Sequence, residues 1–335
     1  NPNAQLFLGF IYSDEKSMKE EFRIPINEKT CINIISPSGD QFSIKNSKQK
    51  TISFRCQTPQ IATNWILALR SQKFLHPSLK IEDFQIISKI GQGYYGRVRL
   101  AKKRDTGEFY AIKSIHKRSL LDSNSVQSVF NERNILSSCN FPFIVSLYYT
   151  FQSPTKFYFC LEFVPGGDLF RHMNETGPLS LSEARFYIAE ISLALDFLHN
   201  IGVVYRDLTP ENILLDAQGH IKLAGFGLSK DIKGDKHFTD FPLGTPRYIA
   251  PEIWDGGEYT EAVDVYAFSM IIYEIVTGEK PLIEFKSKEQ IFINILVKKY
   301  HPTFKYKIPD CYRNLIEMCW SYDPTKRPTF SKIVS

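Results

Sequence analysis

The amino-acid sequence predicts an α+β fold in which two strand-rich segments precede one helix-rich segment. Residues 1–75 contain short runs of Ile and Phe that Asn, Ser, Pro, Gly and Lys separate, followed by one helical repeat. A second strand-rich segment begins at residue 83, and from Ser180 onward apolar residues recur mainly at helical spacing. These observations predict a small β-rich domain, followed by a larger domain that begins with strands and ends with helices.

Length and composition restrict the class of protein. At 335 residues the chain is long enough for two domains, and 43% hydrophobic with 23% charged residues is typical of a globular protein. The formal net charge of +5 is modest, and Lys and Arg are dispersed along the chain. This distribution argues against a nucleic acid as partner.

Cysteine usage and hydropathy indicate the compartment. The six cysteines form no Cys-x-x-Cys pair, so neither a zinc site nor a disulfide framework is indicated. No apolar run approaches the roughly 18 residues that span a bilayer, and no signal-peptide pattern is present. We therefore expect a cytoplasmic protein with reduced thiols, with peripheral membrane contact as the alternative. The chain begins at Asn1 and stops at Ser335 within a helical pattern, which leaves truncation at either end open.

The N-terminal region is expected to be a strand meander closed by one helix. The four predicted strands are residues 22–26, 31–35, 41–44 and 51–56. The helix is predicted within residues 58–71, where apolar residues recur at helical spacing. These residues are Ile61, Trp65, Ile66, Leu67 and Leu69.

Strands capped by a single helix with a buried tryptophan resemble a pleckstrin-homology domain, although residues 1–75 are shorter than a complete one. The resemblance implies phosphoinositide binding through a basic cluster, for which Lys16, Lys19 and Arg23 are the candidates. Acidic residues flank these cations at 14–15 and 20–21, so we expect weak phosphoinositide contact at most. A protein-binding or structural module is the favoured reading. Residues 76–82 form the expected linker.

A glycine-rich segment opens the second strand-rich part of the chain. Gly91, Gly93 and Gly96 form Gly-x-Gly-x-x-Gly, which dinucleotide-binding folds share. Here the glycines lead into a strand, a turn at residues 105–108 and a second strand that carries Lys113, whereas a dinucleotide fold requires a helix. Glycines without Cβ atoms let backbone amides approach phosphates, and Lys113 supplies a cation for them.

A helix is predicted over residues 123–137, with Val126, Val129, Phe130 and Leu136 on its apolar side. This helix carries Glu132, whose carboxylate is expected to pair with Lys113. Arg133 offers a local partner as the alternative.

Residues 203–228 carry the pattern around which the chain is organised. Arg206 and Asp207 are followed five residues later by Asn212, and an apolar hairpin then leads into Phe226 and Gly227. This pattern resembles the catalytic and metal-binding loops of eukaryotic protein kinases. From Ile90 to Asn212 the chain is most similar to the lipid- and cyclic-nucleotide-regulated serine/threonine kinases. Residues 264–269 resemble the tyrosine-kinase-like group instead, so the subfamily stays open.

The resemblance implies a bilobal protein kinase fold, with a five-stranded small lobe at residues 83–164 and a helical large lobe at residues 165–335. It implies that Asp207 accepts the proton of a substrate hydroxyl, that Asn212 binds metal, and that the pair of Lys113 and Glu132 serves the phosphates of ATP. The residues implied to bind the nucleotide are Ile90, Gly91, Gly93, Gly96, Val98, Ala111, Lys113, Leu161, Glu162, Val164, Asp168 and Leu214.

Three structural interactions are also expected in the large lobe. Ser180 and Glu183 have the spacing of a capping box, before a helix over 184–200 with Ile188, Ile191, Leu195 and Leu198 inward. The resemblance further implies a buried ion pair between Glu252 and Arg327, and an anchor for the catalytic-loop backbone at Asp264.

Two departures from the family pattern put the chemistry in doubt. The metal-binding aspartate before Phe226 is Gly225, and the lysine two residues after Asp207 is Thr209. Phe241 also replaces a phosphorylated threonine of the activation segment. We therefore expect a pseudokinase that binds ATP, with weak or absent Mg²⁺ and a protein partner. The alternative is an active serine/threonine kinase that uses Asp207 as base, Asn212 with a single Mg²⁺, and a protein substrate.

Overall fold

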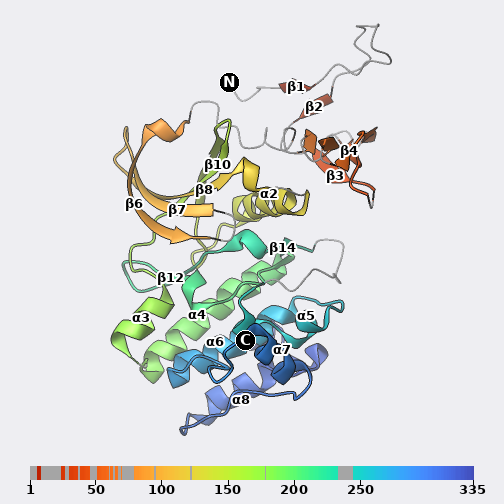
Figure 1. Cartoon of the computed structure of the whole chain (residues 1–335). Coiled ribbons are helices and arrows are strands. Elements are labelled where there is room, and N and C mark those ends of the chain that lie inside the picture. The colour runs from red at the N-terminus through yellow and green to blue at the C-terminus, as the bar shows by residue number, and fades with distance from the viewer. Residues whose placement is uncertain are drawn as a thin grey trace, which may run out of the picture. The chain divides into compact units, whose positions relative to one another are not determined.

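The structure is a computed structural model (Figure 1) that describes residues 6–8, 24–26, 30–36, 38–45, 51–59, 61–62, 65–66, 69, 79–93, 96–120, 123–177, 179–232 and 244–335. The chain divides into two compact units. Unit 1 comprises Asn1–Phe130 and Tyr148–Cys160, and unit 2 comprises Asn131–Leu147 and Leu161–Ser335. Residues 131–147, which belong to unit 2, fall within the small lobe of the predicted domain division.

The N-terminal region is strand-rich, as predicted. Strand β1 (Leu6–Leu8) pairs with β2 (Ile24–Ile26), and β3 (Cys31–Ile34), β4 (Gln41–Lys45) and β5 (Thr51–Arg55) form an antiparallel sheet. The described residues between 59 and 69 are helical. One apolar core comprises Ile32, Phe42, Ile44, Ala62, Ile66 and Leu69.

The side of this helix that faces the core differs from the prediction. Trp65 is 49% exposed and Ile61 is 37% exposed, whereas Ala62 is fully buried. The expectation of a buried tryptophan was therefore wrong. Small Ala62 permits close packing of the helix on the sheet, and helical spacing alone does not distinguish this face from its neighbour. The candidate cations Lys16, Lys19 and Arg23, and the linker residues 76–78, lie outside the described residues.

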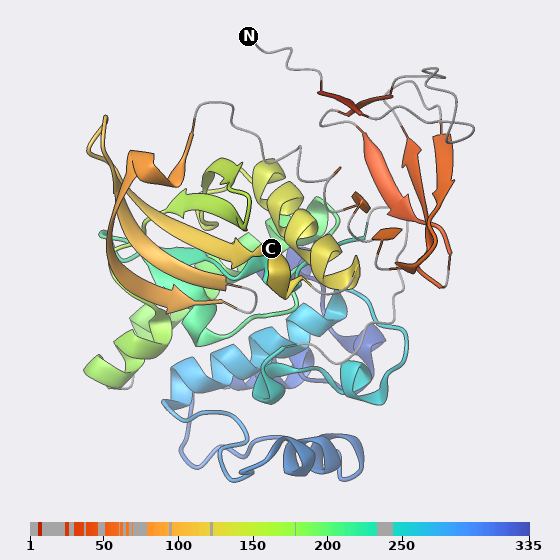
Figure 2. The same ribbon diagram turned by 45° about the horizontal axis from the view of Figure 1, so that its top comes forward.

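A five-stranded sheet forms the second part of unit 1 (Figure 2). Its order is β6 (Phe84–Gln92), β7 (Gly96–Lys103), β8 (Phe109–His116), β10 (Lys156–Glu162) and β9 (Leu147–Gln152). Short 3₁₀ turns at Ile81–Asp83 and Lys117–Ser119 flank β6 and β8. The ring of Phe151 stacks on Phe84 and on Tyr158, which fills the core of this sheet.

Helix α2 (Ser123–Ser138) follows the sheet, and Val126, Val129, Phe130 and Leu136 are buried as predicted. The remaining helices belong to unit 2. They are α3 (Leu169–Thr176), α4 (Leu181–Asn200), α5 (Pro251–Asp255), α6 (Ala262–Thr277), α7 (Lys288–Leu296), α8 (Asp310–Cys319) and α9 (Phe330–Val334).

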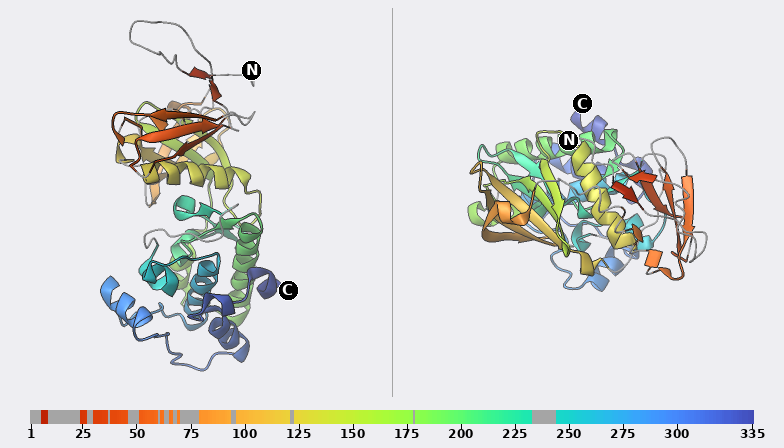
Figure 3. Two further views of the ribbon diagram at one scale, coloured as in Figure 1. Left: turned by 90° about the vertical axis from the view of Figure 1, so that its right-hand side faces the viewer. Right: turned by 90° about the horizontal axis from the view of Figure 1, so that it is seen from above.

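Helix α6 is the centre of unit 2, because every residue from Val263 to Ile275 is buried. Figure 3 shows α4 and α8 alongside it, with α7 further out. The predicted capping box of Ser180 and Glu183 starts α4, and the four predicted inward residues of α4 are buried. Among the described residues, no helix is long and apolar enough to cross a membrane.

Two short two-stranded sheets adjoin these helices. Strand β12 (Ile213–Leu215) pairs with β13 (Ile221–Leu223), and β11 (Val203–Val204) pairs with β14 (Lys230–Asp231). They bracket two 3₁₀ turns, Pro210–Asn212 and Phe226–Leu228. The β12–β13 hairpin therefore brings the end of the 207–212 loop close to residue 225.

Candidate functional site

The glycine segment joins β6 to β7, and the predicted strand, turn and second strand follow as β7, the turn near residue 105 and β8. The amide of Gly93 donates to the carbonyl of Gly96 at 2.8 Å, which closes the turn. A Cβ on Gly96 would collide with the carbonyl oxygen of Ser114, and a Cβ on Gly93 would lie 3.6 Å from Lys113 Cε. Glycine is therefore required at 96, while Gly93 brings the turn close to Lys113.

Lys113 lies on β8, opposite Val98 of β7. Its side chain is 6% exposed, and its Nζ lies 6.0 Å from the centre of the Phe159 ring. Glu132 is also buried, at 2% exposed, but it belongs to unit 2. The pairing of Lys113 with Glu132 therefore stays a prediction.

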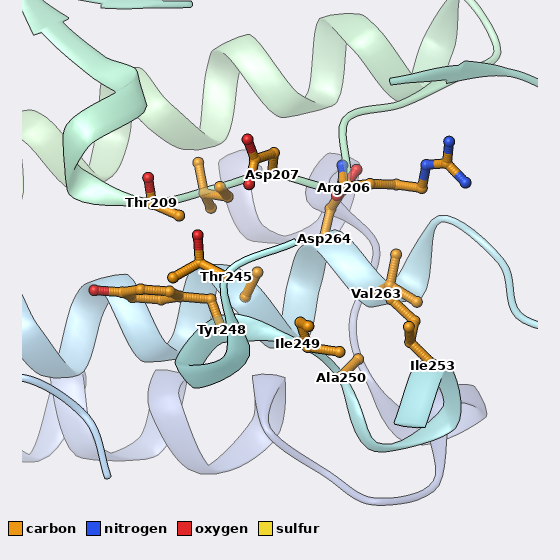
Figure 4. Close-up of a pocket in the computed structure, with 12 residues that line it drawn as sticks. Arg206, Asp207, Thr209, Thr245, Tyr248, Ile249, Ala250, Ile253, Val263 and Asp264 are labelled. Atoms are coloured by element: carbon orange, nitrogen blue, oxygen red, sulfur yellow. Dashed lines mark hydrogen bonds between the residues drawn. The ribbon is translucent and has the colours of Figure 1, made fainter. Parts of the chain in front are cut away.

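Asp264, at the start of α6, anchors the catalytic loop. Its carboxylate oxygens accept hydrogen bonds from the backbone amides of Tyr205 and Arg206, each at 2.8 Å, which confirms the predicted anchor. Nε2 of His199 also lies 2.8 Å from Asp264 Oδ2. Figure 4 shows Asp264 directly beside Arg206. His199 was not among the residues predicted from the sequence, although its position in the last turn of α4, just before the catalytic loop, could have indicated a contact with that loop.

The backbone of Arg206 adopts a positive φ of 66°, which is uncommon for a residue with a side chain. The guanidinium group donates to the carbonyl of Leu228 at 2.6 Å and to the hydroxyl of Tyr259 at 2.9 Å. These bonds, together with Asp264, hold the unusual backbone conformation in place.

Asp207 and Asn212 are in direct contact. The Nδ2 group of Asn212 donates to Asp207 Oδ2 at 2.9 Å and to the Asp207 carbonyl at 2.8 Å. The amide of Ala224 donates to the carbonyl of Asn212 at 2.9 Å, so the end of β13 is tied to the same loop. The structure thus brings Asp207, Asn212 and residue 225 together.

Gly225 has the left-handed conformation, with φ 74° and ψ 36°. A Cβ built on it would lie 2.5 Å from Asn212 Oδ1 and 2.6 Å from Asn212 Cγ. The Asn212 carboxamide therefore occupies the space in which a side chain at position 225 would begin. No sequence pattern indicated this contact.

The oxygen ligands that this loop offers a metal ion are few. Mg²⁺ prefers octahedral oxygen ligands, usually one or two carboxylates with phosphates and water. Of the described residues 207, 212 and 225, Asp207 alone carries a carboxylate, and it accepts a hydrogen bond from Asn212. The described residues contain no group of three or more His, Cys, Asp or Glu side chains that would hold a metal ion.

Thr209 is buried, at 3% exposed, and lines a small pocket beneath the loop (Figure 4). Thr245 and Tyr248 lie on the other side of this pocket, whose remaining wall combines apolar side chains with the charged residues Arg206, Asp207 and Asp264. The Tyr248 hydroxyl donates to Glu274 Oε2 at 2.6 Å. Burial raises the pKa of Glu274 to about 7.

The predicted ion pair of Glu252 and Arg327 is confirmed, with two N–O distances of 2.6 and 2.8 Å. Arg247, which the sequence analysis did not single out, forms a second clamp. Its guanidinium donates to the carbonyls of Pro281 and Phe285, each at 3.1 Å, and to that of Leu282.

Of the residues implied to contact adenine and ribose, Leu161 and Glu162 end β10, and Val164 and Asp168 follow it. The Glu162 amide donates to the Ser146 carbonyl at 2.9 Å, and its carboxylate pairs with Lys222 at 2.9 Å. Asp168 accepts from the Arg171 amide at 2.8 Å and so caps α3. Its carboxylate therefore has a structural role, whether or not it meets a ribose.

The predicted nucleotide residues divide between the units. Unit 1 holds Ile90, Gly91, Gly93, Gly96, Val98, Ala111 and Lys113. Unit 2 holds Glu132, Leu161, Glu162, Val164, Asp168, Asp207, Asn212 and Leu214.

Comparison with known proteins agrees with the fold and the loop geometry. The model of the protein kinase domain matches residues 84–335, so the chain belongs to the protein kinase family. The chain is 40% identical over 250 residues to the serine/threonine protein kinase ypkA of Aspergillus fumigatus, covering 75% of this chain and 39% of the relative. It is 48% identical over 203 residues to the serine/threonine-protein kinase YPK1 of Saccharomyces cerevisiae, covering 61% of this chain and 30% of that protein.

A third relative covers more of the chain. The RAC family serine/threonine-protein kinase homolog of Dictyostelium discoideum is 36% identical over 310 residues, which is 85% of this chain and 69% of that protein. This alignment is longer than the segment 84–335. Against ypkA and YPK1, however, the chain spans less than half of the relative's length.

Proposed function

We propose that this protein is a serine/threonine kinase-like pseudokinase that binds ATP, transfers phosphate weakly or not at all, and acts as a signalling scaffold or allosteric module. One observation carries the proposal. The carboxamide of Asn212 fills the space of a side chain at Gly225 and bonds to the carboxylate of Asp207. The loop is thus closed on itself by the hydrogen bonds from Asn212 to Asp207, at the place where the family has a second carboxylate for metal.

Without a carboxylate at residue 225 to hold metal, we expect phosphoryl transfer to be slow. Metal ions stabilise the charge of the transferring phosphoryl group by several kcal/mol. A loss of about 3 to 4 kcal/mol would slow the reaction roughly 100- to 1000-fold. Thr209 adds to this loss, because no cation at that position meets the γ-phosphate.

The parts expected to hold ATP are retained. The turn at Gly93 lies against Lys113, and Gly96 is sterically required. Lys113 with this turn would hold the phosphates, while Leu161 and the backbones of Glu162 and Val164 would hold adenine. We propose Asp207 as the base for any residual transfer, and a kinase domain that spans residues 83–335.

The N-terminal module, residues 1–75, is proposed to resemble a pleckstrin-homology domain with a protein-binding or structural role. Acidic neighbours of Lys16 and Lys19 keep any phosphoinositide contact weak. Protein partners are therefore proposed as the main ligands of the whole chain besides ATP.

A thermal-shift experiment on the full chain tests ATP binding. ATP is expected to raise the unfolding midpoint equally with Mg²⁺ and with a chelator, and Lys113→Ala should remove the shift in both conditions. A shift that requires Mg²⁺ would show that the metal site works.

A peptide phosphorylation assay tests the second half of the proposal. The chain is expected to remain near the level of the Asp207→Asn variant, which lacks the base. Phosphorylation at ordinary kinase rates, roughly 1 to 100 per second, would instead establish the active kinase that uses Asp207 with Asn212 and a single Mg²⁺.

A further inference from the structure

Helix α7 exposes apolar side chains on the face that points away from the core. Ile291, Asn294 and Ile295 form its buried face. Phe292 and Ile293 of α7 and Val297 directly after it are 38%, 46% and 73% exposed, and we call these three residues the α7 stripe. A surface helix normally carries polar residues on this face. Figure 2 shows α7 as the blue helix at the lower edge of unit 2.

The α7 stripe is held by a rigid support. Phe292 packs edge-to-face against Trp254 of α5, with ring centres 5.8 Å apart. Ser287 caps the start of α7 by accepting from the Gln290 amide. The preceding loop is fixed by Arg247 through the carbonyls of residues 281, 282 and 285. A partner would therefore meet a preformed surface, which reduces the entropy lost on binding.

The segment that contains the stripe has a small excess of positive charge. Residues 284–300 contain four lysines (286, 288, 298 and 299) and two glutamates (284 and 289), a balance of 4 − 2 = +2. Glu284 also hydrogen-bonds to the side chain of Tyr300. The helix dipole accounts for lysines at the C-terminal end of α7. It does not account for Val297 beside them, exposed over 73% of its surface.

We propose that the α7 stripe is a docking site for an acidic segment of a partner protein that carries apolar anchor residues. Apolar anchors would cover Ile293 and Val297, and carboxylates would lie near Lys298 and Lys299. A second copy of the chain fits poorly, because a two-fold interface would bring these lysines together. An anionic membrane fits less well than a protein segment, because helices that bind membranes present an extended apolar face, whereas the stripe has only three exposed apolar residues. The proposal does not depend on phosphotransfer.

Two synthetic peptides test the proposal against the full chain by fluorescence anisotropy. Both carry leucine at helical spacing, and one has Glu where the other has Lys at the polar positions. The Glu peptide is expected to bind about tenfold more tightly, and to weaken as ionic strength rises. Ile293→Asp with Val297→Asp should reduce its affinity about tenfold. Lys298→Glu with Lys299→Glu should reverse the preference between the peptides.

Met318→Asp is the matched control, because Met318 on α8 is also an exposed apolar residue, at 52%. This variant should bind the Glu peptide as the parent does, and unfolding midpoints check that each variant is folded. The proposal is wrong if neither peptide binds, or if the stripe variants bind as tightly as the parent. If the chain binds anionic vesicles and the stripe substitutions abolish this binding, the occupant is a membrane and the proposal is wrong. If the chain dimerises in sedimentation and the same substitutions abolish dimerisation, the occupant is a second copy and the proposal is also wrong.

Discussion

The carboxamide oxygen of Asn212 lies 2.5 Å from the position that a β-carbon on Gly225 would take. The two residues are thus sterically coupled, since a side chain at 225 requires Asn212 to leave its bonds to Asp207. The missing metal ligand is therefore more than an absent carboxylate, because its space has been filled by a neighbour.

The first prediction follows from this coupling. Gly225→Ala should lower the free energy of unfolding by about 1 to 3 kcal/mol, because alanine is strained at positive φ and collides with Asn212. Adding Asn212→Ala should recover part of that loss by removing the collision. Chemical denaturation of Gly225→Ala, of Asn212→Ala and of the double variant measures this. Equal losses for Gly225→Ala in both backgrounds would show that the collision has no energetic effect.

The second prediction concerns repair of the chemistry. Gly225→Asp is expected to introduce Mg²⁺-dependent stabilisation by ATP, because Asp tolerates left-handed φ better than most residues and displaces the Asn212 carboxamide. Thr209→Lys alone should change little. Together they should raise peptide phosphorylation by more than the product of the single gains, since the groups act on the same phosphoryl. Asp207→Asn in the repaired chain is the control that should abolish it. A double variant that stays inactive would locate the defect outside these two positions.

The third prediction concerns pH and the buried carboxyl group of Glu274. Its pKa is raised by burial from 4.5 to about 7, so its stabilising contribution is full below about pH 4.5 and is lost as pH rises through 7. Glu274→Gln keeps an acceptor for Tyr248 and removes this titration. The parent should therefore lose on the order of 3 kcal/mol at most, relative to the variant, between pH 4.5 and 8. If the unfolding free energies of the parent and of Glu274→Gln change equally over this pH range, the raised pKa of Glu274 is contradicted.

The fourth prediction concerns the ion pair of Glu252 and Arg327. Arg327→Met should destabilise unit 2 by about 3 to 5 kcal/mol, because it leaves the carboxylate of Glu252 without its partner. Adding Glu252→Gln should restore part of the loss. Lys326→Met next to it, at an exposed position, is the matched control and should change stability by less than about 0.5 kcal/mol. Thermal unfolding compares the variants, and a loss no larger than that of the control would show that the pair is dispensable.

Much of the fold was predictable because local signals and chain order agree. The capping box at Ser180 and the apolar spacing in α4 depend only on neighbours in the sequence, and both predictions are confirmed. The predicted anchor at Asp264 is confirmed as well, since the kinase resemblance places α6 under the loop.

Other features depend on which surfaces meet, and sequence spacing does not contain that information. The prediction for Trp65 was wrong because two adjacent faces of its helix are both apolar, and packing on the sheet selects the one with Ala62. The contact of Asn212 with Gly225 arises only when two loops fold together. The clamp of Arg247 similarly requires a loop more than thirty residues away.

The anchoring of Tyr205 and Arg206 on Asp264 separates the architecture of the loop from its reactivity. The carboxylate that anchors its backbone belongs to α6, whereas the residues that depart from the family pattern, Thr209 and Gly225, contribute none of those bonds. Substitutions at these two positions can therefore change the reactivity of the loop without rebuilding its support. On the proposed function, a few substitutions in such a chain would give an enzyme, and as few in an active relative would remove one, with the backbone of the loop left intact.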